Sequence, residues 1–357
     1  MLASPGDRTD KAPLTKRSIG SAIFLITIKP QKGQIVYLAK SDFYKTLILS
    51  LLPAIRGSMP ARLQSPMIKI FLFVRTAVLA GLVALGTGHA MAAAPWTGKT
   101  YGNNSAAGHT FEFNGTHFYY ETYGSGAPLF LIHGNGGSIG SFNAQIGALS
   151  RHHKVIAMDS RGQGKSELGT TSLTYEQMSE DSNALLDHLK LDHVKVLGWS
   201  DGGIIGLLLA IHHPEKVGML AVMGANVEPE GAYQWALDGV VRTRTRITGE
   251  IAHSDNPKQL ALQLQLLNLL GNEPHIPLSD LAQIRIPTLV MAGDRDVIRD
   301  EHTLTMFHAL PKSQLAIFPG ATHMIPEHDP ERFNRTVLDF FDKPFAMPDT
   351  KDLGWFD

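Results

Sequence analysis

Short runs of apolar residues alternate with segments of helical periodicity along most of the chain. An Asn114-Gly115 pair follows a polar linker at 95–109 and separates two apolar stretches, which is typical of a β-hairpin. Six later apolar runs have the length of strands that are buried on both faces of a sheet. The predicted strands are 111–113, 117–123, 129–132, 155–158, 194–197, 219–223, 288–291 and 315–318, and the predicted helices are 174–189, 201–212, 301–309 and 330–341. This alternation predicts an α/β fold with a doubly wound, mostly parallel sheet that starts with antiparallel strands.

One segment interrupts the alternation of strands and helices. Between Asn226 and Ile286 the pattern is helical, over 233–246 and again over 259–270. An ordinary pair of crossover helices would explain it, but about 60 residues exceed what a bare crossover needs, which favours a small helical cap over a site. We therefore predict a core of 95–226 and 284–342, a cap of 227–283 and a C-terminal tail of 343–357.

The first hundred residues have the features of a targeting segment. Basic residues precede a short apolar run at 76–85, and an Ala90-Met91-Ala92 cleavage pattern follows it, so 59–94 is predicted to be a secretory signal peptide. The run is too short to span a bilayer, so no stable membrane span is expected in the mature chain, although an uncleaved anchor is the alternative. Residues 1–58 are predicted to be disordered or non-native, with translation starting at Met59 or Met67.

The charge of the chain is unevenly distributed. The first 92 residues carry 12 Lys/Arg and 3 Asp/Glu, which leaves 20 basic and 30 acidic residues in the remainder. A folded part with a net charge near −10 argues against nucleic acid as a partner. The chain has no cysteine, so disulfides, a thiolate nucleophile and Cys-ligated metal are excluded. A periplasmic or secreted location fits these features.

The segment 194–210 is the centre of the chemistry. An apolar strand-like run leads into Gly198-Trp199-Ser200-Asp201-Gly202, and an apolar helical run follows at once. A G-x-S-x-G sequence between a strand and a helix places its serine in a strained turn, with the hydroxyl exposed beside the helix N-terminus. Gly198 and Gly202 are expected to be required because a Cβ at either position would clash where strand and helix meet. Ser200 is the predicted nucleophile.

A glycine-rich turn, His133-Gly134-Asn135-Gly136-Gly137, follows the third predicted strand. Such a turn brings a backbone N–H to a substrate oxyanion, and we predict that Asn135 supplies it together with the N–H of Asp201. A phosphate-binding loop is the alternative, but the spacing matches neither G-x-G-x-x-G nor a P-loop.

Two acidic residues and one histidine follow the last two predicted strands. Asp294 and Asp296 come after 288–291, where a carboxylate can orient an imidazole and stabilise its protonated form. His323 comes after 315–318 and would take the Ser200 proton and return it to the leaving group. The chain order Ser, Asp, His, with each residue after its own strand, predicts a catalytic triad.

The remaining candidates predict no metal and no cofactor. The pairs His152-His153 and His212-His213 point their side chains apart and match no zinc motif, so we interpret them as solvated surface. The loop at 158–166, with its arginine at 161, is interpreted as structural support beside the site.

Taken with their spacing, these motifs resemble the α/β-hydrolase superfamily over about 110–342. The matching segments are 133–137, 159–166, 198–203, 293–296 and 320–323. The resemblance implies an eight-stranded α/β-hydrolase fold with a cap between strands six and seven. It implies Ser200 as nucleophile, His323 as base and Asp296, three residues after a glycine, as the acid. Serine at 200 argues against the dehalogenase and epoxide-hydrolase branches.

The GWSDGG sequence is similar to that of the valacyclovir-hydrolase (biphenyl-hydrolase-like) group. In that group the acid after the nucleophile favours substrates with an α-amino group, so Asp201 and Trp199 are the predicted substrate-binding residues. The alternative for Asp201 is simple stabilisation of a helix N-terminus by a carboxylate.

These features together predict an exported serine hydrolase that cleaves small or medium carboxylic esters through an acyl-enzyme. Its partner would be a small-molecule ester. The alternatives are a non-hydrolytic ligand-binding or receptor protein on the same fold, an acyltransferase, a lactonase or a C–C hydrolase.

Overall fold

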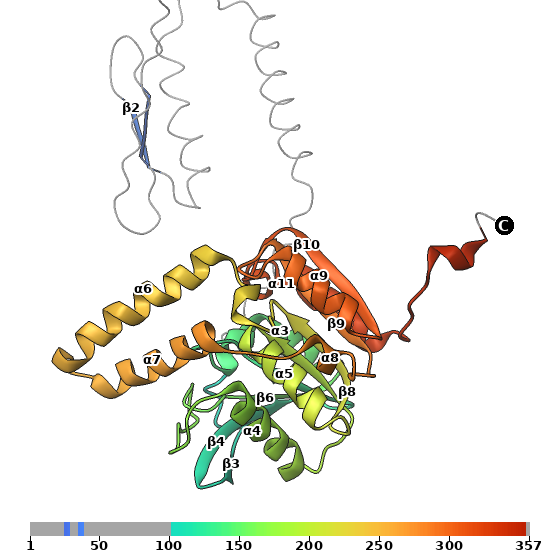
Figure 1. Cartoon of the computed structure of the whole chain (residues 1–357), viewed down its shortest axis with the longest axis horizontal. Coiled ribbons are helices and arrows are strands. Elements are labelled where there is room, and N and C mark those ends of the chain that lie inside the picture. Colours follow the sequence, from blue (N-terminus) through green and yellow to red (C-terminus); the bar gives the residue numbers. More distant parts are fainter. Residues whose placement is uncertain (1–24, 29–34, 39–100, 355–357) are drawn as a thin grey trace, which may run out of the picture. The chain divides into compact units, whose positions relative to one another are not determined.

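The computed structural model describes residues 25–28, 35–38 and 101–354 (Figure 1). The chain divides into two units, 1–95 and 96–357, and each is described by itself. In the first unit, β1 (Leu25–Ile28) and β2 (Ile35–Leu38) form an antiparallel pair. The predicted signal peptide at 59–94, and the rest of the predicted extension at 1–58, lie outside the described residues.

An eight-stranded sheet forms the centre of the second unit. Its spatial order is β10-β9-β8-β7-β5-β6-β4-β3. The strands from β5 to β10 pair in parallel, whereas β3 pairs with β4 and β4 with β6 in antiparallel fashion. The bounds are β3 (Gly108–Phe113), β4 (Thr116–Tyr123), β5 (Pro128–Ile132), β6 (Lys154–Met158), β7 (Val194–Trp199), β8 (Val217–Met223), β9 (Thr288–Arg295) and β10 (Ser313–Thr322). The predicted α/β fold and mostly parallel sheet are confirmed.

The hairpin between β3 and β4 turns at Asn114-Gly115, as predicted. Both residues have positive φ, 50° and 69°, which is the backbone that a two-residue type I′ turn requires. Asparagine and glycine tolerate this conformation, so the turn sequence fixes the register in which Phe113 faces Thr116.

Helices cover both faces of the sheet. Residues of α4, α5 and α9 share one apolar core with the sheet, and residues of α3 and α11 share the other. The strands between these two cores are apolar on both faces, which explains their continuous apolar runs. The bounds are α3 (Asn143–Leu149), α4 (Tyr175–His188), α5 (Asp201–His212), α9 (Asp300–Ala309), α10 (Ile325–His328) and α11 (Pro330–Asp342).

The segment between β8 and β9 is helical, and two of its helices lie side by side and project away from the sheet (Figure 1). It contains η3 (Pro229–Gly231), α6 (Gln234–Glu250), η4 (Ile251–His253), α7 (Pro257–Asn272) and α8 (Leu278–Leu281). In α6 only Ile247 is buried, and in α7 only Leu266 and Leu269 are. We call α6, η4 and α7 the arm; its attachment to the core therefore rests on few buried side chains. In the described residues no helix is long and apolar enough to cross a membrane.

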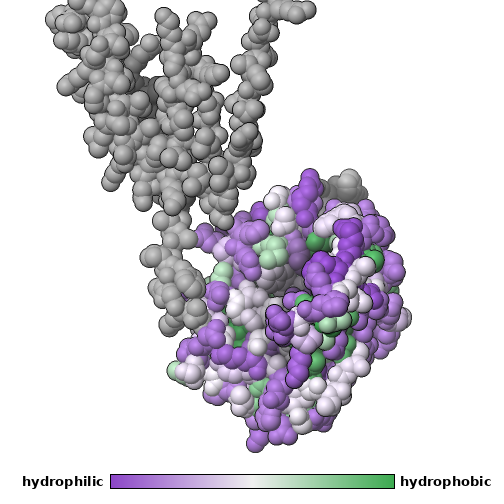
Figure 2. Space-filling view, turned by 90° about the vertical axis from the view of Figure 1, so that its left-hand side faces the viewer, coloured by the Kyte–Doolittle hydropathy of each residue, from purple (hydrophilic) through white to green (hydrophobic). Residues whose placement is uncertain are grey.

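The surface on the side to which the arm projects is largely hydrophilic (Figure 2). Hydrophobic side chains appear there as small separate patches, which is ordinary for a protein surface. One of the exposed large hydrophobic residues is Trp235 of α6, whose exposed fraction is 60%.

A buried carboxylate holds the first described residues of this unit against β4. Glu121 is completely buried and accepts hydrogen bonds from the backbone N–H of Gly102 (2.7 Å) and Asn104 (2.9 Å). It also accepts from the hydroxyls of Tyr119 (2.7 Å) and Tyr123 (2.6 Å). Four donors satisfy a charge that would otherwise be costly to bury. Burial and the contact with Glu121 raise the pKa of both tyrosines well above the usual value.

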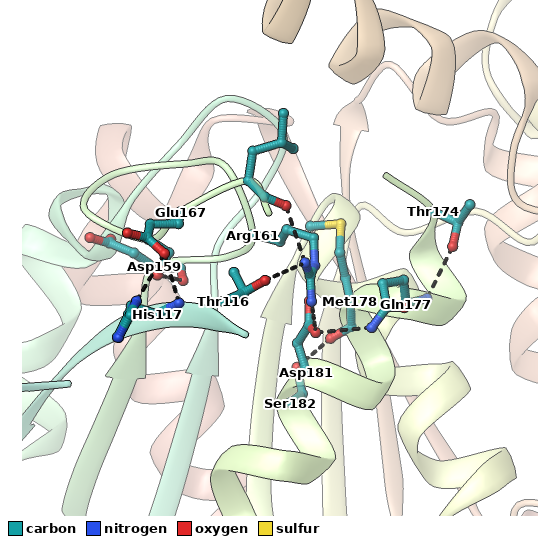
Figure 3. Close-up of polar contacts among 12 residues, drawn as sticks. Thr116, His117, Asp159, Arg161, Glu167, Thr174, Gln177, Met178, Asp181 and Ser182 are labelled. Atoms are coloured by element: carbon teal, nitrogen blue, oxygen red, sulfur yellow. Dashed lines mark hydrogen bonds and ion pairs between the residues drawn. The ribbon is translucent and has the colours of Figure 1, made fainter. Parts of the chain in front are cut away.

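The arginine of the 158–166 loop sits in a buried ion pair, as Figure 3 shows. Arg161 donates through Nε to Asp181 Oδ2 at 2.7 Å and through Nη2 to Asp181 Oδ1, and both side chains are only 1% exposed. Its Nη1 donates to the Leu168 carbonyl at 3.1 Å and to Thr116 Oγ1 at 3.3 Å. The guanidinium also lies over the Phe118 ring, 5.1 Å from its centroid. Arg161 thus joins β4, α4 and its own loop, the supporting role that the sequence indicated.

Candidate active site

Ser200 lies in a sharp turn between β7 and α5. Its φ of 58° and ψ of −122° are strained for a residue with a side chain, and such strain is often found at functional sites. The turn is held by the Ser200 N–H, which donates to the Met223 carbonyl of β8 at 2.7 Å. A Cβ at Gly198 would overlap the Gly202 carbonyl, and one at Gly202 would overlap that of Ile132. The predicted need for both glycines is confirmed.

The predicted acid and base are brought into direct contact. Asp296 directly follows β9, His323 directly follows β10, and His323 Nδ1 lies 2.7 Å from Asp296 Oδ1. The carboxylate is buried and also accepts the backbone N–H groups of Gly293, Val297 and Ile298. Because an ionised carboxylate only accepts, Nδ1 carries the proton and Nε2 is left free to act as a base.

Ser200 and His323 line one cavity of about 380 Å³, within the usual range of small-molecule sites. In the described part of the chain, the Ser200 hydroxyl makes no hydrogen bond to His323. Such bonds are often long in ligand-free enzymes and shorten when substrate binds. The three groups nevertheless lie at the carboxyl ends of neighbouring parallel strands, in the order β7, β8, β9 and β10. Ser200 follows β7, Asp296 follows β9 and His323 follows β10.

The glycine-rich turn is fixed by the side chains around it. His133 Nδ1 contacts the Gly134 carbonyl at 2.8 Å, and His133 Nε2 accepts the Ser160 N–H at 3.0 Å. The Gly136 N–H donates to Gln163 Oε1 at 2.7 Å. Complete burial lowers the pKa of His133 to about 4, so the ring is neutral at pH 7 and carries its proton on Nδ1.

The two predicted oxyanion donors border the cavity. The backbone N–H groups of Asn135 and Asp201 donate to no other residue in the described part of the chain, whereas the neighbouring N–H of Gly136 is bonded. N–H groups that are free next to a nucleophile can donate hydrogen bonds to the negatively charged oxygen of a tetrahedral intermediate.

The Asp201 carboxylate is buried, and no ion pair with it occurs among the described residues. Its exposed fraction is 2%, and its Oδ2 accepts from Asn135 Nδ2 at 2.8 Å. Burial raises its pKa to about 6, against the pull of that hydrogen bond. Tyr175 is so close that the Asp201 charge adds to burial in raising its pKa. The nearby Tyr175 hydroxyl also opposes the rise in the Asp201 pKa, although the Tyr175 hydroxyl and Asp201 Oδ1 make no hydrogen bond of normal geometry among the described residues.

Trp199 contacts the base as well as the cavity. Its Nε1 donates to the His323 carbonyl at 3.0 Å, and the two ring centroids are 6.4 Å apart. The indole is almost fully buried and lines the cavity. Trp199 therefore ties the loop of the base to the strand of the nucleophile, and its role in substrate binding stays a prediction.

Several cavity residues were not predicted from the sequence. Tyr175 and Glu273 line the cavity, and the Tyr175 N–H donates to Glu273 Oε2 at 3.0 Å. The arm and the residues leading into it add an apolar wall of Ala232, Ala236, Leu237, Val240 and Leu270. The helical periodicity of the arm was the only sequence signal for this wall, and nothing marked Tyr175 or Glu273.

One histidine assignment was wrong. His153 is only 2% exposed and lies 3.0 Å from Asp342 Oδ1, whereas the sequence suggested a solvated side chain. Burial, together with nearby Lys195, lowers its pKa. Its position directly before β6 places its ring against Phe341 and Asp342 of α11, which explains its burial. The described residues contain no group of three or more His, Asp or Glu side chains placed to hold a metal ion.

The buried charge of Asp201 predicts a pH-dependent gain in stability from Asp201→Asn. In the native protein the folded carboxyl titrates near pH 6, and the unfolded one near 3.8. Between these values the folded state holds a proton that the unfolded state has lost, so stability falls as pH rises, by up to ~3 kcal/mol. Asparagine keeps the acceptor for Asn135 and removes the charge.

We therefore expect the Asn variant to unfold at higher urea concentration than the native protein at pH 7.5, by about 1–3 kcal/mol, with little difference at pH 4. Urea denaturation at both pH values measures this. A stability difference of equal size at the two pH values would contradict the assignment of the buried charge to Asp201.

Known proteins resemble the chain in sequence and in structure. Residues 127–282 match the family model of the alpha/beta hydrolase fold. RutD of Azorhizobium caulinodans, a proposed carbamate hydrolase, is 27% identical over 256 residues, which cover 62% of this chain and 94% of that protein. The serine hydrolase BPHL of Mus musculus is 25% identical over 246 residues, covering 64% of this chain and 84% of its own.

A solved structure shows the same fold. The crystal structure of a hydrolase from Pseudomonas aeruginosa PA01 superimposes with a TM-score of 0.56 at 24% identity, covering 67% of this chain and 100% of that one. The structural match agrees with the sheet order, the strained serine and the sequence relatives. The chain belongs to the α/β-hydrolase superfamily and is a hydrolase of that family.

Proposed function

We propose that the protein is a serine hydrolase that cleaves carboxylic esters of small or medium size through an acyl-enzyme. One observation carries the proposal: the strained Ser200 shares a cavity with His323, whose ring is oriented by the buried Asp296 at 2.7 Å. This arrangement corresponds to nucleophile, base and orienting acid.

In the proposed reaction, Ser200 Oγ attacks the ester carbonyl carbon while His323 Nε2 takes the proton of the Ser200 hydroxyl. Asp296 holds the ring and stabilises its protonated form, and the N–H groups of Asn135 and Asp201 bind the oxyanion. His323 then protonates the departing alcohol. Water then attacks the acyl carbon while His323 Nε2 takes a proton from the water. His323 returns this proton to Ser200 Oγ as the acid is released.

The charge of the cavity favours substrates that carry an amine. Asp201, Glu273 and Glu327 line it, and none of its lining residues is a lysine or arginine. Asp201 Oδ1 has no partner among the described residues, so an ammonium group could satisfy it. An amino-acid ester is accordingly the substrate subclass that we propose.

Carbamate cleavage is the second candidate, because RutD carries that proposed activity. A carbamate carbonyl is attacked in the same way and develops the same oxyanion. The fold does not distinguish the two bonds, so the distinction must come from substrates.

The experiment uses the full chain, a fluorophosphonate probe and a substrate panel. The panel contains p-nitrophenyl esters of graded chain length, a matched pair of esters with and without an α-amino group, and a p-nitrophenyl carbamate. We expect the probe on Ser200, turnover of short esters and preference for the amino ester. Preference for the carbamate would replace the ester proposal, and a folded protein that neither labels nor turns over would indicate a binding protein.

The amine part has its own control. Asp201→Ala should remove most of the preference for the amino ester over its des-amino partner. An unchanged ratio of the two kcat/KM values would mean that Asp201 only stabilises the helix N-terminus. Export is proposed from the sequence alone, and N-terminal sequencing of the mature protein from fractionated cells tests cleavage after 92.

A further inference from the structure

The side chain of Asn135 joins three parts of the molecule. Its Nδ2 donates to Asp201 Oδ2 at 2.8 Å and to the Leu266 carbonyl at 3.0 Å. Asp201 is the first residue of α5, and Leu266 lies in the middle of α7. A single amide therefore links the glycine-rich turn, the nucleophile helix and the arm.

The rest of the turn is fixed from the opposite side. His133 holds the Gly134 carbonyl, and Gln163 holds the Gly136 N–H. The Asn135 N–H shares a planar peptide unit with the Gly134 carbonyl, which also accepts the Gly137 N–H, and it donates to no residue in the described part of the chain. The Gly134 carbonyl thus sets the orientation of that N–H, and the Asn135 side chain holds its own Cα, and with it the position of the turn, against α5 and α7.

The contact with α7 is important because the arm buries few side chains against the rest of the protein. Only Leu266 and Leu269 of α7 are buried, and the Asn135 bond meets α7 at Leu266 itself. A second polar link, from the Tyr175 N–H to Glu273, lies just past the end of α7. Both links start from residues next to the Asp201 carboxylate.

We propose that Asn135 is a positioning residue, whose side chain holds the glycine-rich turn, and with it the oxyanion donor at 135, in place over the nucleophile by bridging Asp201 and the arm. The inference rests on the proposed function, since an oxyanion forms only if acyl transfer occurs. It goes further in assigning α7 a part in the chemistry: the arm fixes one anchor of the oxyanion donor.

The residue type matches this role. Both anchors, a carboxylate and a carbonyl oxygen, are acceptors, so the bridging group must donate twice. A carboxamide has two N–H bonds and no charge, whereas alanine offers none and aspartate would bring a second carboxylate against Asp201. Misplacement of an oxyanion donor lowers the rate of the chemical step and leaves ground-state binding largely unchanged.

The test uses four full-length variants and a p-nitrophenyl ester: Asn135→Ala, Asn135→Asp, Asp201→Asn, and the last two combined. Asn135→Ala should lower kcat about 10- to 100-fold with KM changed less than about threefold. Asn135→Asp should lose at least as much. The combined variant reverses donor and acceptor between 135 and 201, so it should recover part of the loss of Asn135→Asp.

Hydrogen exchange provides a readout that does not depend on turnover. Asn135→Ala should exchange faster in 257–272 than the native protein, and circular dichroism should show an intact fold. A kcat within twofold of native, no recovery in the combined variant, or unchanged exchange in α7 would each overturn the proposal. Failure of the proposed function is distinct, because the native protein would then show neither labelling nor turnover.

Discussion

Replacing Ser200 by alanine is expected to lower kcat/KM for ester hydrolysis by about 10⁴- to 10⁶-fold and to abolish fluorophosphonate labelling. The remaining rate would come from the oxyanion donors and from binding alone. The loss should be chemical, because the hydroxyl makes no hydrogen bond to His323 in the described residues, so its removal breaks no such contact of the fold. Steady-state kinetics with a p-nitrophenyl ester and gel fluorescence of the labelled protein measure the two effects.

Two further variants make this result specific. Asp296→Asn should reduce kcat by about 10⁴-fold, because the neutral amide no longer selects the Nδ1-protonated ring. Ser160→Ala is a matched control: this serine is buried near the turn, and its hydroxyl has no hydrogen-bond partner among the described residues. Its activity should stay within about threefold of native. Labelling that persists in Ser200→Ala would contradict the assignment of the nucleophile.

Arg161→Met is expected to lower the free energy of unfolding by about 3–5 kcal/mol. Arg161 and Asp181 are both 1% exposed and joined by two hydrogen bonds (Figure 3). Methionine fills much of the space but leaves the Asp181 carboxylate buried without a counter-ion. The remaining bond from Gln177 Nε2 to Asp181 at 3.0 Å cannot neutralise that charge. Urea denaturation followed by circular dichroism measures the loss.

The double variant Arg161→Met with Asp181→Leu separates the charge from the packing. If the cost comes from the uncompensated carboxylate, removing it should return a large part of the lost stability, since apolar replacement of a whole buried pair is often nearly neutral. Arg161→Lys should remain destabilised, because a lysine cannot form two parallel hydrogen bonds to one carboxylate. A double variant as unstable as the sum of both single changes would contradict this explanation.

Much of the fold could be predicted because its signals are local. Strands between two helical layers need continuous apolar runs, and the Asn114-Gly115 pair by itself predicts a two-residue hairpin turn. The strand ends were less accurate at β9 and β10, which extend to Arg295 and Thr322, directly before the acid and the base. The short helices α3, α8 and α10 were missed, because four to seven residues carry too little periodicity.

The contacts that define the site were less accessible from sequence. The Trp199 indole meets a carbonyl 124 positions away, and Asn135 meets one 131 positions away. An acceptor that is a backbone oxygen leaves no mark on its residue type, so no pattern could reveal either bond. The same limit applies to His153, whose ring meets Phe341 and Asp342 of α11, far along the chain.

The order of the strands has a consequence for the chain during its synthesis. The nucleophile follows β7, but the orienting acid and the base follow β9 and β10, at one edge of the sheet. A nascent chain that extends to Asn226 already contains six of the eight strands and Ser200, yet neither Asp296 nor His323. Chains emerge from the ribosome N-terminus first. A truncated or unfinished product would therefore carry the serine without its acid and base, and the three residues would come together only when the last strand joins the sheet.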